Sequence, residues 1–108
     1  MSALDLEALR HRSLPYLGFS DNTAIHLQLS RLGIVSFHGP HAGAVETDFS
    51  RDCLRLVLCS PDSPGRLPGA PDGEPVTTIS GGTAEGRLAG GNLSILAAMC
   101  GTPWSLRA

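Results

Sequence analysis

The pattern of apolar and polar positions is clearest in the N-terminal part of the chain. PYLGFS at 15–20 and IVSFHGP at 34–40 are short, mainly apolar runs beside proline or glycine, as is typical of buried strands. Between them, DNTAIHLQLSRLG at 21–33 has apolar residues at helical spacing and ends at a glycine. A strand, a helix and a strand in succession form a βαβ unit, so we expect the two strands to be parallel. We expect Ser20 or Asp21 to cap this helix. Its predicted apolar face consists of Ala24, Ile25, Leu29 and Leu32.

Two segments on either side of this unit have helical patterns. LDLEALRHR at 4–12 predicts a short helix that Pro15 ends, because the residue before a proline avoids the helical region. DFSRDCLRLVLCS at 48–60 predicts a helix with Asp48 or Ser50 as its cap. The residues of this helix that we expect to face inward are Cys53, Leu54, Val57 and Leu58.

The C-terminal part of the chain predicts one strand and one helix. VTTIS at 76–80 is β-branched, which favours a strand. NLSILAAMCG at 92–101 predicts a helix with an Asn92 cap and a terminating Gly101, and Pro103 prevents its continuation.

The segment SPDSPGRLPGAPDGEP at 60–75 is rich in proline and glycine and is the best candidate for a domain boundary. It separates 1–59 from 76–108, where a lone strand and helix bury too little surface to form a core. We therefore predict an α/β protein with a parallel βαβ end of one domain, a linker and the start of a second α/β domain. Both ends of the chain look cut, so we expect a piece of a larger protein.

Composition excludes several classes. The chain has 108 residues and a net charge of -2, and it has no basic stripe with interleaved aromatic residues, which argues against nucleic-acid binding. The longest apolar run, Ile95–Cys100, is far shorter than the roughly 20 residues of a membrane span. The three cysteines form no C-x-x-C pair and the N-terminus lacks a signal sequence, so we expect reduced, buried thiols in a cytoplasmic protein.

Candidate chemistry is sparse when each residue is taken alone. Two glycines before a helix can expose free N–H groups to an anion, or can simply make a tight turn into the helix. Glu85 suits a general base or a solvated surface acid, and His38 stands where a predicted parallel strand ends, the usual place for ligands in open α/β sheets. The sequence has no G-x-S-x-G motif, and Ser20 is better explained as a helix cap than as a nucleophile. Histidine and cysteine spacings match no zinc site.

Two segments together carry a more specific signal. LGFSDNTAIHLQLSRLGIVSFHGP at 17–40 and EGRLAGGNLSILAAMCGTPW at 85–104 resemble, in the same order, two segments of the serine L,D-carboxypeptidase family. The family motifs are Gly-Tyr-Ser-Asp followed by Thr-Phe-His-Gly-Pro, and Glu-Gly-x-Leu-x-Gly-Gly-Asn-Leu followed by Gly-Thr-Pro-aromatic. Phe19 replaces the usual tyrosine, and Asn22 stands where an apolar residue is common.

The resemblance implies an N-terminal α/β domain with a nucleophilic serine and a C-terminal domain with a glutamate and a histidine. In such an enzyme the histidine takes the serine proton, the glutamate orients the histidine, and the serine attacks the amide beside a D-amino acid. The resemblance places that serine before Leu4, and the glutamate and histidine after Pro103. Glu85 is then no triad member, and we expect no catalytic residue, cofactor or metal ligand in this chain. The residues expected to line the cleft are Ser20, Asp21, His38, Gly39, Gly90, Gly91 and Asn92.

We therefore expect an inactive piece of a cytoplasmic serine carboxypeptidase of peptidoglycan recycling. On this interpretation, 1–59 is the C-terminal part of the nucleophile domain, 60–75 the linker and 76–108 the beginning of the C-terminal domain. The expected partner of the complete enzyme is a muropeptide or related peptide, without nucleic acid or membrane, and a homodimer stays open. A non-catalytic homologue that acts as a binding module, and an unrelated α/β domain with a chance likeness, are the alternatives.

Overall fold

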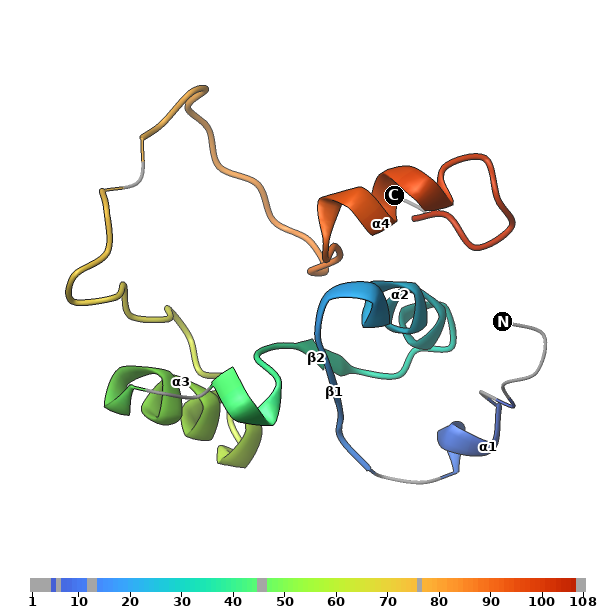
Figure 1. Ribbon diagram of the computed structural model, residues 1–108, viewed down its shortest axis with the longest axis horizontal. Helices are drawn as coiled ribbons and strands as arrows, with labels where there is room; N and C mark the ends of the chain where they lie inside the picture. Colours follow the sequence, from blue (N-terminus) through green and yellow to red (C-terminus); the bar gives the residue numbers. More distant parts are fainter. Residues whose placement is uncertain (1–4, 6, 12–13, 45–46, 76, 107–108) are drawn as a thin grey trace. The chain divides into compact units, whose positions relative to one another are not determined.

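The computed structural model describes residues 5, 7–11, 14–44, 47–75 and 77–106 (Figure 1). The chain divides into two compact units. Unit 1 consists of Met1–Ala44 and Ala89–Ala108, and unit 2 consists of Val45–Leu88. The predicted boundaries at 60–75 stay a prediction, because they concern domains of a larger protein.

Unit 1 contains the predicted βαβ arrangement. Strand β1 (Tyr16–Gly18) pairs with β2 (Ser36–His38), and α2 (Thr23–Arg31) connects them. The pairing is parallel and sets Tyr16 opposite Ser36 and Gly18 opposite His38, which confirms the predicted α/β topology. A short 3₁₀ helix, η2 (Ala42–Ala44), follows β2. The predicted N-terminal helix is reduced to α1 (Glu7–Arg10), and Leu4, Leu6 and Arg12 of that prediction lie outside the described residues.

The core of unit 1 is built around α2. Among the described residues the buried hydrophobic side chains are Leu27 and Leu29, and three polar residues of the same helix are buried with them: Thr23, His26 and Gln28. The predicted apolar face is right at Leu29, whereas the other three members are only partly buried. Helix α2 packs against both β2 and α4 (Leu93–Met99), so its buried residues are not confined to the predicted face.

The start of α2 differs from the prediction. Ser20 and Asp21 do not cap it, because a 3₁₀ turn, η1 (Ser20–Asn22), comes first and places Asn22 at the cap position. The Asn22 side chain makes no capping hydrogen bond. Its amide instead donates to the Phe19 carbonyl at 2.9 Å, and its Oδ1 accepts from the Tyr16 hydroxyl at 2.6 Å.

The last helix of unit 1 agrees with the sequence. The Asn92 side chain accepts a hydrogen bond from the Ile95 N–H at 3.2 Å and so caps α4. Gly101 has φ +75°, the left-handed conformation that commonly ends a helix. Among the described residues, every helix is too short or too polar to cross a bilayer.

Unit 2 has one regular element, α3 (Asp48–Cys59), among its described residues. Its cap is Thr47, whose Oγ1 accepts from the Ser50 N–H at 3.1 Å, so the predicted caps Asp48 and Ser50 were wrong. The four side chains expected to face inward are partly buried.

The strand predicted at 76–80 is absent from its described part, 77–80. Ile79 is fully exposed, and among the described residues no neighbouring strand pairs with this segment. A strand needs a partner to satisfy its backbone, so β-branched composition alone was insufficient.

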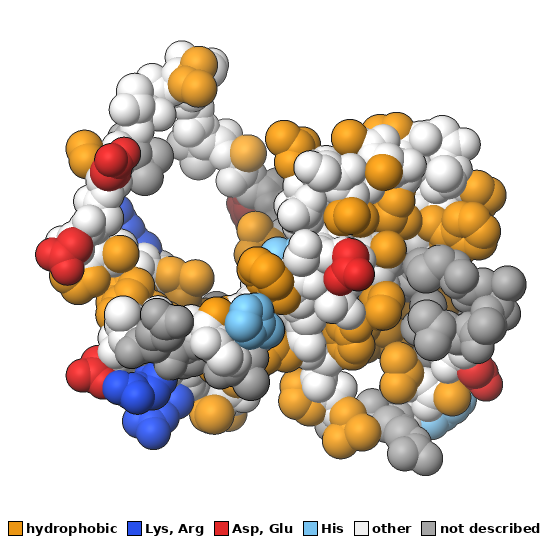
Figure 2. Space-filling model, in the orientation of Figure 1, with side chains coloured by type: hydrophobic (Ala, Val, Ile, Leu, Met, Phe, Trp, Pro, Cys, Tyr) orange, Lys and Arg blue, Asp and Glu red, His pale blue; other side chains and the backbone are white. Residues whose placement is uncertain are grey.

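The cysteines are free, as expected, but only Cys53 is partly buried. Cys59 and Cys100 are exposed, so the expectation of buried thiols was wrong for them. Cys59 is the last residue of α3, and Cys100 follows the last residue of α4. Hydrophobic side chains are visible over much of the surface in Figure 2.

The exposed loop after α3 generates a proteolysis test. Residues 65–75 are all exposed, whereas the middle of α2 is buried. We expect trypsin to cut after Arg66 before it cuts after Arg31, as mass spectrometry of a limited digest can show. Cleavage after Arg31 first would mean that unit 1 is not packed around α2.

Candidate functional site

The turn between β1 and α2 holds Ser20 in an unusual backbone conformation. Phe19 is extended, with φ -126° and ψ 153°, and Ser20 then has φ +54°. Ser20 is the one residue other than glycine with positive φ in the described part of the chain, and such a conformation costs about 1–3 kcal/mol. Hydrogen bonds hold the turn, from the Asn22 N–H to the Phe19 carbonyl at 3.1 Å and from Thr23 Oγ1 to the Ser20 carbonyl at 2.7 Å.

This geometry changes the interpretation of Ser20. A serine on a strained turn from a strand to a helix is the arrangement of the nucleophile elbow in α/β hydrolases. The sequence lacks the G-x-S-x-G motif, so that motif does not identify Ser20. The sequence does place Gly-x-Ser between a predicted strand and a predicted helix, which is the order found in such an elbow. A serine directly before a helix also suits a cap, and sequence alone favours this simpler interpretation.

The hydroxyl of Thr23 joins this turn to the start of α4. Thr23 is fully buried; its Oγ1 donates to the Ser20 carbonyl and accepts from the Asn92 N–H at 2.9 Å. A Cβ on Gly91 would lie 2.5 Å from Thr23 Oγ1, and Gly91 has φ +148°. The structure therefore brings Gly91 and Asn92 beside the Ser20 turn. Close packing explains why residue 91 is a glycine.

His26 connects α2 to both strands. Its Nε2 lies 3.2 Å from the Gly18 carbonyl and its Nδ1 lies 2.9 Å from Ser36 Oγ. Because a carbonyl only accepts, Nε2 carries the proton of the neutral ring and Nδ1 accepts from the Ser36 hydroxyl. Burial lowers the pKa of His26; the Gly18 hydrogen bond opposes this effect, and nearby His38 lowers the pKa further.

An exposed group of rings lies at the carboxyl ends of the two strands. The His38 ring is 5.5 Å from that of His26 and 5.9 Å from that of Phe19, which also contacts His41 at 5.8 Å between ring centroids. The Gly39 N–H donates to the Gly18 carbonyl at 3.1 Å. His38 is the last residue of β2 and Ser20 comes two residues after β1, so both lie at the carboxyl ends of the parallel strands. Among the described residues the Ser20 hydroxyl makes no hydrogen bond to a histidine.

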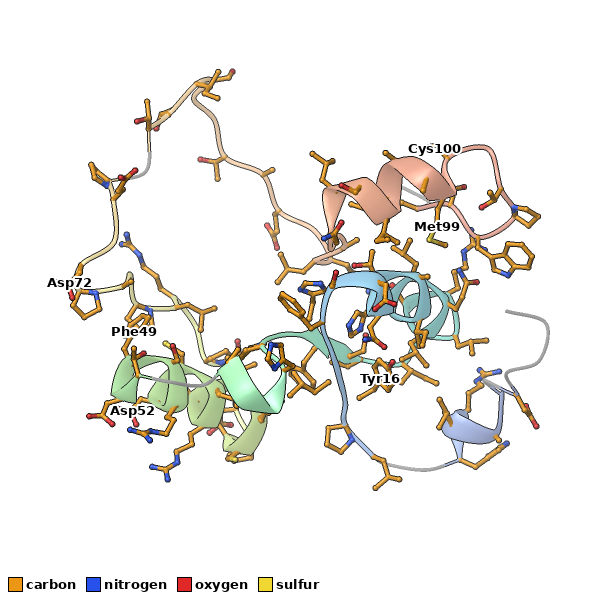
Figure 3. All side chains as sticks on the ribbon, in the orientation of Figure 1. Tyr16, Phe49, Asp52, Asp72, Met99 and Cys100 are labelled. Atoms are coloured by element: carbon orange, nitrogen blue, oxygen red, sulfur yellow. The ribbon has the colours of Figure 1, made fainter. Side chains whose placement is uncertain are left out.

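Other predicted positions have a plainer environment. Asp21 is exposed. Burial raises the pKa of Tyr16, which is labelled in Figure 3, and the negative charge of Asp21 raises it further. Gly90 has φ +150° with no neighbouring atom where a Cβ would stand. Glu85 is exposed in unit 2. The described residues contain no group of three or more side chains suited to a metal.

Unit 2 has a separate open hollow of about 520 Å³. Phe49 and Asp52, both labelled in Figure 3, line it together with Cys53, Leu56 and residues of the 68–71 loop. None of the predicted site residues lies there. Its lining is mostly apolar, so it offers no candidate reacting group beyond one acid and one thiol.

The known proteins that this chain resembles are all named as carboxypeptidases. Residues 1–39 match the family model described as the LD-carboxypeptidase N-terminal domain. The chain is 37% identical over 107 residues to a protein of Streptomyces coelicolor named as a carboxypeptidase, covering 93% of this chain and 32% of the relative. It is 29% identical over 110 residues to a Bacillus subtilis protein named as a murein peptide carboxypeptidase, covering 97% of this chain and 34% of that relative.

A third relative, from Synechocystis and also named as a carboxypeptidase, is 38% identical over 94 residues, which cover 82% of this chain and 27% of the relative. The chain thus spans about a third of the length of the curated relatives that it matches. No solved structure matches it significantly.

The contact between Gly91 and Thr23 can be tested by substitution. Gly91→Ala should destabilise the chain by about 1–3 kcal/mol, because the new methyl group overpacks against a buried side chain. Gly90→Ala is the matched control, since its backbone angle is similar but its Cβ meets no atom within 4 Å. Urea unfolding monitored by circular dichroism measures both. Equal losses in the two variants would contradict the packing of α4 on Thr23.

His26 predicts a pH dependence of stability. Its pKa is lowered in the folded chain, so between that value and about 6.5 the unfolded chain binds a proton that the folded chain does not. The free energy of unfolding should therefore fall as pH drops below about 6.5, and this part of the dependence should vanish in His26→Gln. His11→Gln, at an exposed position, is the control. Urea midpoints that respond to pH equally in wild type and His26→Gln would contradict the assignment.

Proposed function

By sequence the chain belongs to the LD-carboxypeptidase family, and we propose that it forms part of a serine-type enzyme of that family. The proposed reaction is hydrolysis of the amide bond to a terminal D-amino acid in a muropeptide or related peptide. The relative named as a murein peptide carboxypeptidase supports this substrate class. A cytoplasmic location, a role in peptidoglycan recycling and a homodimer of the whole enzyme belong to the same proposal.

The observation that carries the proposal is the positive φ of Ser20 on the turn from β1 into α2. In the proposed mechanism Ser20 Oγ attacks the amide carbonyl carbon while a base accepts its proton. The C–N bond then breaks, the leaving nitrogen takes that proton, and water hydrolyses the resulting ester. The strain of the turn gives a physical reason to prefer Ser20 over a serine before Leu4, the position that the resemblance implies. That earlier placement stays an untested expectation.

The base and its orienting acid are proposed to come from sequence that follows Pro103 in the longer relatives. An unassisted serine hydroxyl is a weak nucleophile. The described residues supply no hydrogen-bonded histidine at Ser20, so we propose that the 108-residue chain is inactive alone.

We also propose that the residues predicted to line the cleft do so in the complete enzyme. Asp21 directly follows Ser20, and Gly91 and Asn92 approach its turn through Thr23. His38 and Gly39 lie at the same edge of the sheet as Ser20, and Gly90 precedes the Gly91 contact.

A chimera provides the decisive test of function. The aligned third of the Bacillus subtilis relative is replaced by this chain, and release of terminal D-alanine from a muropeptide tetrapeptide is measured. We expect hydrolysis by the chimera and none by the 108-residue chain alone. Ser20→Ala should lower kcat by about 10⁴- to 10⁶-fold. Ser30→Ala, at an exposed position of α2, is the matched control and should keep the activity.

Two results would contradict the proposal. Full activity of the Ser20→Ala chimera would place the nucleophile elsewhere, including before Leu4. A folded but inactive chimera would favour the alternative of a non-catalytic binding module.

A further inference from the structure

The far end of α2 holds the backbone that follows α4. Gln28 Nε2 donates to the Trp104 carbonyl at 3.2 Å. Arg31 donates from Nη1 to the Pro103 carbonyl and from Nη2 to the Ser105 carbonyl, the latter at 2.6 Å. Two side chains one helical turn apart thus bind three consecutive carbonyls, and we call this arrangement the Gln28–Arg31 clamp.

The clamp is internally braced. Arg31 Nη1 also donates to Gln28 Oε1 at 3.4 Å, and Gln28 is 8% exposed. A buried amide that lost its partner would be costly, so the carbonyl of Trp104 is the group that satisfies it. A guanidinium presents several donors in a fixed plane, which suits it to binding two carbonyls at once.

The clamped segment is a pair of turns with its own hydrogen bonds. The Thr102 N–H donates to the Met99 carbonyl at 3.1 Å, and the Ser105 N–H donates to the Thr102 carbonyl at 3.2 Å. Such short-range bonds shape the turns but do not fix them to the rest of unit 1. The clamp supplies that attachment.

Both ends of α4 are therefore tied to the same helix. Thr23 holds the Asn92 N–H near the Ser20 turn, and eight residues later, about 12 Å along the helix axis, Arg31 holds the segment after α4. The direction in which the backbone passes Ser105 is thus set relative to Ser20 by one rigid element.

We propose that Gln28 and Arg31 are positioning residues, which set the place of the sequence that follows Ser105 relative to the Ser20 turn. Their catalytic importance rests on the proposed function, because the longer relatives continue beyond this point and the base is proposed to lie there. The clamp acts through backbone carbonyls, so it should influence the geometry of the reacting groups without touching substrate.

The first experiment measures the clamp in the 108-residue chain. Arg31→Met should speed hydrogen exchange at the Thr102 and Ser105 amides at least about tenfold, because two charge-assisted hydrogen bonds are lost. Acrylamide quenching of Trp104, the single tryptophan of the chain, should increase with it. Arg55→Met, at an exposed position of α3, should change neither. Unchanged exchange in Arg31→Met, or wild-type quenching already at the level in urea, would overturn the proposal.

The second experiment separates positioning from stability in the active chimera. Arg31→Met should lower kcat by up to about 10²-fold with KM nearly unchanged, since small misplacements of reacting groups have costs of this size. Arg31→Lys, which keeps the charge but not the fork, should fall between wild type and Arg31→Met. Rates are normalised to the concentration of folded enzyme, so a purely structural role would leave kcat unchanged and overturn the proposal. An inactive wild-type chimera would instead count against the proposed function, while the exchange experiment still decides the clamp.

Discussion

The hydroxyl of Thr23 is the interaction on which the geometry of unit 1 depends. It donates to the carbonyl of Ser20, three residues earlier, and accepts from the N–H of Asn92, which is 69 residues later. Thr23 is completely buried, so loss of the hydroxyl would deprive the Asn92 N–H of this acceptor, at about 1–3 kcal/mol, and would leave the Ser20 carbonyl with the Thr23 N–H as its donor. One side chain thus links a local turn to a distant helix.

This link also explains how a strained serine can persist. The positive φ of Ser20 costs about as much as one or two good hydrogen bonds contribute. Thr23 Oγ1 donates to the Ser20 carbonyl, and the backbone and side-chain N–H groups of Asn22 both donate to the Phe19 carbonyl, so the peptide groups on either side of the Ser20 Cα are held. Several bonds therefore determine one turn. The serine side chain is kept out of the capping role that its sequence position suggests, as the proposed role of its hydroxyl requires.

Local patterns predicted the parallel strands and the ends of α4 correctly, because short apolar runs, an asparagine cap and a terminating glycine act within a few residues. The same local rules failed at Ser20 and Thr47. A capping preference cannot tell which of several neighbouring polar residues has the required backbone angles. The strand at 76–80 failed for a different reason, since pairing depends on a partner that the pattern of the segment does not specify.

The candidate site was predictable only in part. Gly91, Asn92 and His38 were singled out from the sequence, but the polar residues that organise the site were not. Thr23 and Gln28 are buried polar residues whose hydrogen-bond partners are 69 and 76 residues away. Apolar periodicity carries no information on such distant pairs. His26 is buried between closer partners, since its ring nitrogens contact Gly18 and Ser36 of the two strands, 8 and 10 residues away.

The backbone angle of Ser20 is the most direct test of this account, and an experimentally determined structure of the protein would measure it. The account predicts φ near +54°, with the Thr23 hydroxyl between the Ser20 carbonyl and the Asn92 N–H. A negative φ at Ser20, with its side chain capping α2, would contradict it, because the turn would then be an ordinary start of a helix.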